Sequence, residues 1–177
     1  MSDDRARRAP AIRLSGWSGA GKTVFGVRLV EELGRRGYRV GVIKHARKHP
    51  GPQDHEGKDT TRYREAGAAA VAGVFAQETV LRLPSTETAL DELLAMLAGS
   101  VDLVIVEGYN DDELPTIAVY RTEQGRELRL PRRGALVAVV SDDPAAPEPR
   151  YDAADVEGVG DAVERWLKGW LADLAGG

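Results

Sequence analysis

The feature that most constrains the fold is an eight-residue segment near the start of the chain, residues 16–23. It reads Gly-Trp-Ser-Gly-Ala-Gly-Lys-Thr and fits the pattern G-x-x-x-x-G-K-[ST] without a mismatch. A short apolar run at residues 11–14 precedes it, and apolar residues at helical spacing follow it from residue 22 to 36. Glycines permit the tight turns that aim backbone N–H groups inward, and a helix beginning there adds partial positive charge. The segment therefore predicts a strand, a loop that cradles phosphate groups, and a helix.

Two side chains of this loop carry specific expectations. Lys22 is expected to reach the terminal phosphates of a nucleotide, and the Thr23 hydroxyl to bind Mg²⁺. A carboxylate at the end of a neighbouring buried strand normally completes such a magnesium site. Residues 101–106 are the clearest buried strand, and because ligands lie at the carboxyl ends of strands, we expect Glu107 rather than Asp102 at the site. There it would hold Mg²⁺ or orient an attacking water. The predicted phosphate cradle consists of Gly16, Trp17, Ser18, Gly19, Ala20, Gly21, Lys22 and Thr23.

Short apolar runs alternate with helical patterns along the chain, which is typical of a parallel sheet with crossover helices. Strands are expected at 11–14, 38–43, 69–75, 80–83, 101–106, 116–121, 127–130 and 136–140, and helices at 22–36, 87–97 and 159–174. Gln124-Gly125 predicts a hairpin between 116–121 and 127–130. We expect an α/β, P-loop NTPase-like three-layer sandwich whose mostly parallel sheet carries an added antiparallel hairpin. Residues 1–10 are expected to be a flexible tail, and residues 11–177 a single nucleotide-binding domain.

The composition argues against several classes of function. The chain has 24 Lys and Arg against 28 Asp and Glu, a net charge of −4, which argues against wrapping nucleic acid. It has no cysteine, so thiol chemistry and cysteine-based metal sites are excluded and a cytoplasmic location is expected. Its apolar runs are far shorter than the ~20 residues that a membrane span needs. We therefore expect neither a nucleic-acid nor a membrane partner.

A basic segment follows the second expected strand. Residues 44–64 hold six basic and three acidic side chains, together with all three histidines, His45, His49 and His55. Lys44 and His45 stand where that strand ends, on the expected nucleotide side. The histidine spacing does not match a known metal site. We therefore favour a charged loop that contacts an anionic substrate or partner over a metal site, with a solvated loop as the alternative.

Four segments together give the chain a resemblance to a known family. Besides the phosphate loop, they are VGVIKH at 40–45, GKDT at 57–60 with Arg62 and AGA at 66–68, and DLVIVEGY at 102–109. They resemble the molybdopterin-guanine dinucleotide biosynthesis protein B family from about residue 12 to residue 121, and more weakly beyond. The phosphate loop is common to many families, whereas the Ile-Lys-His and Gly-Lys-Asp elements make the resemblance specific.

The resemblance implies a GTP-binding protein that uses Mg²⁺ and hydrolyses GTP weakly. Such a protein assists a separate guanylyltransferase that joins GMP to molybdopterin, and it is a homodimer; direct contact with molybdopterin is left open. By position, the resemblance implies that residues 16–23 bind the GTP phosphates and that Glu107 is the acid at the end of the strand. It also implies a loop facing the nucleotide or the pterin, made of Lys44, His45, Lys58 and Asp59. The chain departs from the family at 46–48, where Ala-Arg-Lys stands in place of further histidines.

The sequence gives a weaker indication of how the guanine base of the nucleotide would be recognised. Guanine is usually read by a carboxylate that accepts from N1–H and N2–H just past a later strand. Asp142 follows the strand expected at 136–140, at the correct end of the sheet, but the chain has no Asn-Lys-x-Asp pattern. Asp142 as the residue that reads the base is therefore a hypothesis, and GTP itself is implied mainly by the resemblance.

Two other functions fit the same scaffold. A small-molecule kinase would use a basic lid over the transferred phosphate, made of Arg126, Arg129, Arg132 and Arg133. Gln124-Gly125 argues against this lid, because it favours a hairpin at this place. The basic face of such a hairpin could equally bind a partner. A nickel-delivery GTPase is the other alternative, but such proteins usually carry metal-binding cysteines. We find no clear candidate for an arginine finger, which agrees with slow hydrolysis.

Overall fold

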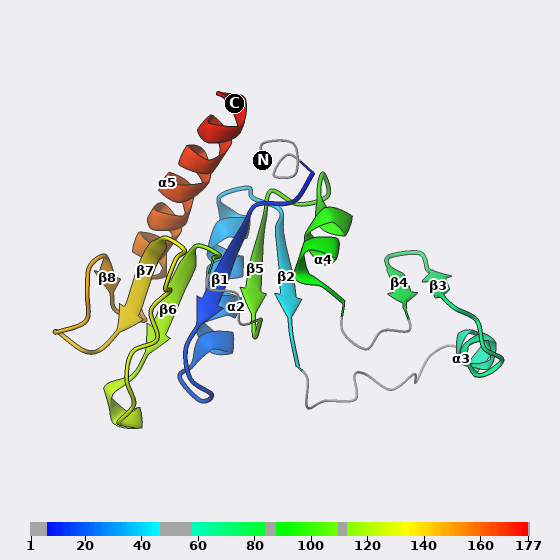
Figure 1. Ribbon diagram of the computed structural model, residues 1–177, viewed down its shortest axis with the longest axis horizontal. Helices are drawn as coiled ribbons and strands as arrows, with labels where there is room; N and C mark the ends of the chain where they lie inside the picture. The colour runs from blue at the N-terminus through cyan, green and yellow to red at the C-terminus, as the bar shows by residue number, and fades with distance from the viewer. Residues whose placement is uncertain (1–6, 47–57, 84–87, 110–112, 177) are drawn as a thin grey trace. The chain divides into compact units, whose positions relative to one another are not determined.

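The computed structural model describes residues 7–46, 58–83, 88–109 and 113–176. The chain divides into two compact units, one of residues 1–45 and 90–177 and one of residues 46–89. Among the described residues, the larger unit contains a six-stranded sheet with α-helices, and the smaller unit contains one helix and a strand pair (Figure 1). A single domain over residues 11–177 stays a prediction.

The sheet of the larger unit is parallel throughout. Its strand order is β2-β5-β1-β6-β7-β8, and each of its pairings is parallel. Because β1 lies in the interior, the phosphate loop that follows it begins at the middle of the carboxyl edge. The strands are β1 (Ala11–Ser15), β2 (Val40–Lys44), β5 (Leu103–Glu107), β6 (Thr116–Tyr120), β7 (Leu136–Ser141) and β8 (Arg150–Tyr151).

Helices cover both faces of this sheet, which confirms the three-layer α/β fold. α2 (Lys22–Arg35) and α5 (Val156–Ala175) pack on one face, and α4 (Leu90–Leu97) packs on the other (Figure 1). In β5, Leu103 and Ile105 join the core with α2 and α5, whereas Val104 and Val106 join the core with α4. Burial on both sides explains why this strand is a continuous apolar run. In the part of the chain that the structure describes, no helix has the length and apolar character to cross a membrane.

The hairpin expected at residues 116–130 is wrong. β6 pairs in parallel with β1 on one side and with β7 on the other, so neither of its edges can take an antiparallel partner. The chain leaves β6 through a short 3₁₀ helix, η1 (Thr122–Gln124), and turns at Gly125, where φ is 58°. Residues 126–133 then form a connection without a strand.

The antiparallel pair lies in the smaller unit. β3 (Val71–Val74) pairs with β4 (Thr79–Arg82), which confirms the strands expected at 69–75 and 80–83. They follow α3 (Lys58–Glu65), a helix that lies largely in the segment expected to be a charged loop, residues 44–64. Its eight residues, KDTTRYRE, contain a single apolar side chain, so no apolar periodicity marked the helix.

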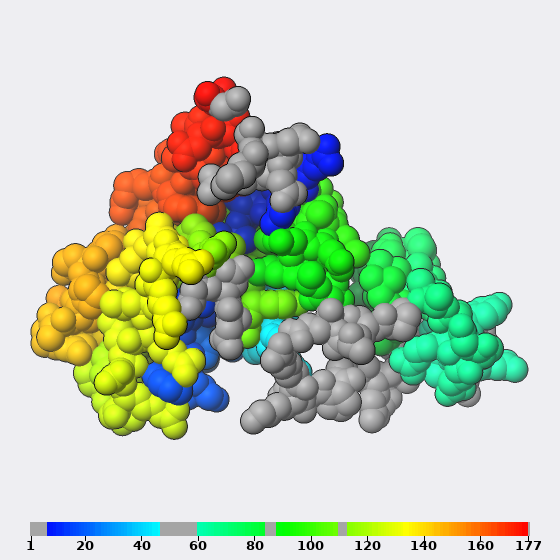
Figure 2. All heavy atoms as spheres, in the orientation of Figure 1, coloured from blue at the N-terminus to red at the C-terminus, as the bar shows by residue number. Residues whose placement is uncertain are grey.

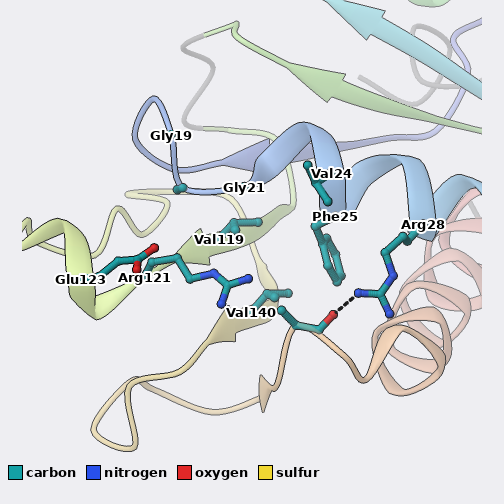
Figure 3. Close-up of a pocket in the computed structure, with 11 residues that line it drawn as sticks. Gly19, Gly21, Val24, Phe25, Arg28, Val119, Arg121, Glu123 and Val140 are labelled. Carbon is teal, nitrogen blue, oxygen red and sulfur yellow. Dashed lines mark hydrogen bonds between the residues drawn. The ribbon is translucent and has the colours of Figure 1, made fainter.

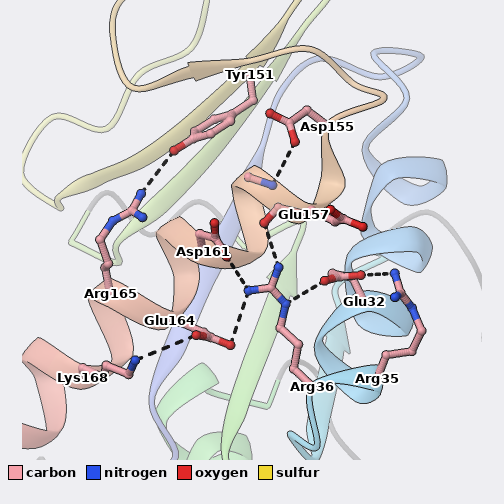
Figure 4. A network of polar contacts seen from close by, with 11 residues as sticks. Glu32, Arg35, Arg36, Tyr151, Asp155, Glu157, Asp161, Glu164, Arg165 and Lys168 are labelled. Carbon is pink, nitrogen blue, oxygen red and sulfur yellow. Dashed lines mark hydrogen bonds and ion pairs between the residues drawn. The ribbon is translucent and has the colours of Figure 1, made fainter.

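A network of charged side chains joins α2 to α5 (Figure 4). Arg36, directly after α2, donates from Nε to Glu32 Oε1 at 2.6 Å and from Nη1 to Asp161 Oδ1 at 2.7 Å. Its Nη2 donates to the carbonyl oxygen of Glu157 at 2.9 Å. The hydrogen bond from Arg36 holds the pKa of the buried Glu32 carboxyl below its usual range. Arg36 thus shares the buried Glu32 carboxylate with Arg35, which donates to Glu32 Oε2, and it ties the last turn of α2 to the start of α5.

We expect Arg36→Ala to lower the midpoint of thermal unfolding clearly more than Lys168→Ala. Removing Arg36 leaves the Glu32 carboxylate with less compensation, whereas Lys168 makes an exposed helical pair with Glu164 at 3.9 Å, worth about 0.5 kcal/mol or less. Because the native pKa of Glu32 is lowered, the advantage of the wild type over Arg36→Ala should shrink as the pH falls below 4.5. Equal melting temperatures for the two variants at neutral pH would contradict this role.

Candidate functional site

The phosphate loop connects β1 to α2 in the expected way. Gly16 approaches β6 so closely that a Cβ atom at this position would lie 2.3 Å from the carbonyl oxygen of Val119. Its φ of 149° also lies where L side chains are rarely found. At the other end of the loop, Gly21 has a φ of 86° and caps the N-terminus of α2. Geometry therefore requires glycine at both ends of the loop.

Lys22 folds back over this loop. Its ammonium donates to the carbonyl oxygens of Gly16 at 3.0 Å and Trp17 at 2.9 Å. Partial burial lowers the pKa of Lys22; Glu107 opposes this effect, and the nearby cations Lys44 and Arg129 add to it. An anion at this position would favour the charged form of Lys22.

Glu107, Thr23 and Lys44 meet at the carboxyl edge of the sheet, although they come from three different elements. The Thr23 hydroxyl lies 3.1 and 3.2 Å from the two Glu107 carboxylate oxygens. Lys44 Nζ donates to Thr23 Oγ1 at 3.2 Å and lies 3.6 Å from Glu107 Oε2. The Glu107 side chain is 15% exposed and that of Lys44 is 52% exposed. A hydroxyl and a carboxylate are hard oxygen ligands, so their chemistry fits the predicted magnesium site.

Asp102 lies at the opposite end of β5, as expected. It accepts hydrogen bonds from the backbone N–H of Arg39 and from the Arg39 guanidinium, both at 2.7 Å. This pair fixes the start of β5 against the start of β2 and leaves Glu107 as the acid at the loop.

His45 joins the ends of β2 and β5. Its backbone N–H donates to the Glu107 carbonyl oxygen at 2.8 Å, and its ring stacks on Tyr109 with centroids 4.4 Å apart. Gly108 makes this approach feasible, because a Cβ there would lie 2.4 Å from the His45 carbonyl oxygen. The structure therefore brings Lys44 and His45 to the same edge as the loop.

The other residues of the basic segment belong to the smaller unit. Lys58 and Asp59 begin α3, and their predicted place near the nucleotide stays a prediction. His49 and His55 lie outside the described residues. Within the described ranges, no group of three or more acidic or histidine side chains gathers to hold a metal.

Sequence reasoning missed the partners of Trp17. The guanidinium carbon of Arg129 lies 3.4 Å from the centre of the Trp17 ring, and that of Arg126 lies 4.7 Å from it. The indole N–H also donates to the carbonyl oxygen of Glu127 at 2.8 Å. On the face shown in Figure 2, blue atoms of the phosphate loop accordingly lie against yellow-green atoms of the connection after β6. The sequence shows several arginines at residues 126–133, but they lie more than a hundred residues after Trp17, and no pattern in the sequence links them to it.

A cavity of about 340 Å³ lies beside the loop (Figure 3), and its strand residues come from β6 and β7, on the other side of β1 from β5. Its lining residues are Gly19, Ala20, Gly21, Val24, Phe25, Arg28, Val119, Arg121, Glu123, Val140 and Ala153. They come from the loop, the first turns of α2, the carboxyl ends of β6 and β7, the turn after β6 and the segment before α5. A pocket of this size beside the predicted phosphate cradle can hold one end of a small ligand.

Asp142, the predicted reader of the base, follows β7 at the correct edge of the sheet. Its Oδ1 accepts from the backbone N–H of Thr122 at 2.9 Å, and its Oδ2 lies 3.2 Å from the Thr122 hydroxyl. These contacts, chiefly the one from the backbone N–H, hold the pKa of Asp142 below its usual range. Both carboxylate oxygens thus contact the turn that follows β6. A direct contact between Asp142 and the base stays a prediction.

Comparison with known proteins assigns a family. The model described as "MobB: Molybdopterin guanine dinucleotide synthesis protein B" matches residues 11–142. The chain belongs to this family. A relative from Escherichia coli (strain K12), named molybdopterin-guanine dinucleotide biosynthesis adapter protein, is 35% identical over 167 residues, covering 90% of this chain and 94% of the relative. A relative of the same name from Haemophilus influenzae is 30% identical over 162 residues, with 89% of each covered.

Solved structures of MobB proteins share the fold. A crystal structure of molybdopterin-guanine biosynthesis protein B has a TM-score of 0.67 at 24% identity, covering 89% of this chain and 99% of the other. The crystal structure of Bacillus subtilis MobB has a TM-score of 0.66 at 25% identity, covering 88% and 96%. The family model and the two relatives confirm the family resemblance, and they favour an adapter function over the kinase and nickel-delivery alternatives.

We expect Gly16→Ala to destabilise the protein by at least about 2 kcal/mol, because the new methyl group would overlap the Val119 carbonyl and the backbone would be strained. Gly34→Ala is the matched control, since a Cβ there meets nothing within 4 Å inside α2. That change should be neutral or stabilising by up to about 1 kcal/mol. Urea unfolding followed by circular dichroism measures both, and a Gly16→Ala variant as stable as the wild type would refute the close approach.

Proposed function

We propose that the chain is a homodimeric adapter in molybdopterin-guanine dinucleotide biosynthesis that binds GTP with Mg²⁺, hydrolyses it slowly and assists a separate guanylyltransferase. Family membership supports the biosynthetic role, because both described relatives are named biosynthesis adapter proteins. The observation that carries nucleotide binding is the convergence of Lys22, Thr23 and Glu107 around one loop at the carboxyl edge of the sheet.

Each residue of this group has a distinct task in the proposal. The loop N–H groups and the N-terminus of α2 attract the phosphates, and Lys22 places a positive charge at their terminal oxygens. Thr23 and Glu107 would hold Mg²⁺, which neutralises phosphate charge when bound. Lys44 lies within hydrogen-bonding distance of Thr23 and adds positive charge at the same point. The arginines on Trp17 add further positive charge outside the loop.

Titration calorimetry of the full chain with GTP and with ATP, in the presence and absence of Mg²⁺, tests this proposal. We expect micromolar binding of GTP, and Lys22→Ala should weaken it by roughly 10- to 150-fold through loss of a charge-assisted contact. Lys168→Ala, which removes an exposed lysine of α5, is the matched control and should bind like the wild type. GTP affinity that is unchanged in Lys22→Ala would reject the site.

Glu107→Gln separates the magnesium ligand from the phosphate contacts. The neutral amide is a poorer ligand, so Mg²⁺ should strengthen GTP binding several-fold less than it does in the wild type. Without Mg²⁺, the variant should bind GTP at least as tightly as the wild type, because a negative charge next to the phosphates is gone. If Mg²⁺ strengthens binding equally in both proteins, Glu107 is not a magnesium ligand.

A further inference from the structure

The cavity beside the phosphate loop is lined by Arg121, whose guanidinium makes no hydrogen bond with a described residue, although its charge helps to lower the pKa of Asp142. Arg121 follows β6 and extends its guanidinium into the cavity, toward Val140 (Figure 3). It is half-buried, and no described residue accepts a hydrogen bond from its guanidinium. Arg28, on the opposite wall, differs, because its guanidinium donates to the carbonyl oxygens of Ala153 at 2.8 Å and Ala154 at 3.3 Å. The Arg121 guanidinium is therefore available to a ligand that supplies hydrogen-bond acceptors.

The remaining walls favour a partly apolar ligand. Val24, Phe25, Val119, Val140 and Ala153 present side-chain carbon to the cavity, and Glu123 adds a single carboxylate. Glu123 is exposed and makes no hydrogen bond or ion pair with a described residue. The ligand should therefore have apolar faces, acceptors on one edge and donors on another. Because Gly19 and Gly21 of the phosphate loop form the adjoining wall, the same ligand can have phosphates in the loop.

We infer that this cavity takes the purine base of the nucleotide, and that Arg121 and Glu123 select guanine. The inference rests on the proposed function. The O6 and N7 atoms of guanine are both acceptors and match a guanidinium fork, whereas adenine presents an amino donor in place of O6. Guanine also offers N1–H and N2–H donors to a carboxylate, whereas N1 of adenine is an acceptor that a carboxylate repels. The two opposite charges thus disfavour adenine on both edges.

In this arrangement Asp142 positions the residues that contact the base and does not contact the base itself. Its two carboxylate oxygens contact Thr122, which stands between Arg121 and Glu123 in the chain. Asp142 is therefore a positioning residue, which fixes the turn from which both readers project. An amide at position 142 could still accept the hydrogen bond from the Thr122 backbone, so Asp142→Asn should keep the preference for GTP. A direct acceptor of guanine N1–H and N2–H would lose that preference in the same variant.

The inference is tested by measuring dissociation constants for GTP, ITP, XTP and ATP in the presence of Mg²⁺. The wild type should prefer GTP to ATP by at least tenfold. Arg121→Ala should weaken GTP by roughly 5- to 150-fold, the range for a bidentate contact, with ATP little changed. Arg121→Lys keeps the charge but loses the fork, so it should also lose the preference. Arg165→Ala, on α5, is the matched control and should leave every affinity unchanged.

Glu123→Gln should strengthen the binding of one nucleotide, XTP, and a misfolded variant would not bind any nucleotide more tightly. ITP lacks the 2-amino group, so the preference of the wild type for GTP over ITP should disappear in this variant. The 2-oxo group of XTP accepts a hydrogen bond from an amide, so XTP should bind the variant more tightly than it binds the wild type.

The outcomes separate this inference from the proposed function. If the wild type binds GTP and ATP equally, or if Arg121→Ala weakens both equally, the phosphate site stands and selection of guanine by Arg121 is overturned. A guanine preference that persists in both Arg121→Ala and Glu123→Gln overturns the assignment of the readers alone. If the wild type binds neither nucleotide, the proposed function fails and the inference fails with it.

Discussion

The interior position of β1 in a parallel sheet is the constraint on which the candidate site depends. Because β1 pairs in parallel with β5 and β6, the ends of all three strands reach the same edge of the sheet. Register then places Glu107 opposite Leu14 on one side and opposite Lys44 on the other. The loop after β1 therefore meets a carboxylate and a lysine on one flank and the cavity on the other. A strand at the edge of the sheet would have offered only one of these flanks.

The elements that were predicted correctly from the sequence carry their signal within a few neighbouring residues. The phosphate loop has its glycines, and β5 its continuous apolar run, while Glu107 followed from the rule that parallel strands present ligands at their carboxyl ends. The hairpin at 116–130 failed for the opposite reason. Its turn signal, Gln124-Gly125, is local, but the partners of β6 are β1 and β7, and burial between those two strands outweighed the turn. α3 lacked an apolar stripe and gave no periodic signal.

Contacts between distant segments account for what the sequence did not predict at the site. Trp17 looked like an ordinary variable position of the loop pattern, yet it packs against Arg129 and bonds to Glu127, more than a hundred residues later in the chain. Asp142 was placed at the correct end of the sheet, but its engagement with Thr122 depends on the turn after β6 that replaced the expected hairpin. The same turn therefore explains why the hairpin prediction failed and why the Asp142 carboxylate contacts Thr122, while a contact between Asp142 and the base stays a prediction. A connection that runs beside the loop, rather than pairing as a strand, brings Arg121 and Glu123 to the cavity.

The ammonium group of Lys44 already places a positive charge at the carboxyl edge of the sheet. Its ammonium lies against the same hydroxyl and the same carboxylate that suit a divalent ion. If the proposed Mg²⁺ binds between Thr23 and Glu107, it would compete with the Lys44 ammonium for the same two groups. If Lys44 withdraws as the metal enters, the local charge rises by one unit instead of two, which reduces the electrostatic cost of holding a metal beside Lys22. In that exchange a cation would lie beside the Glu107 carboxylate both before and after the metal binds.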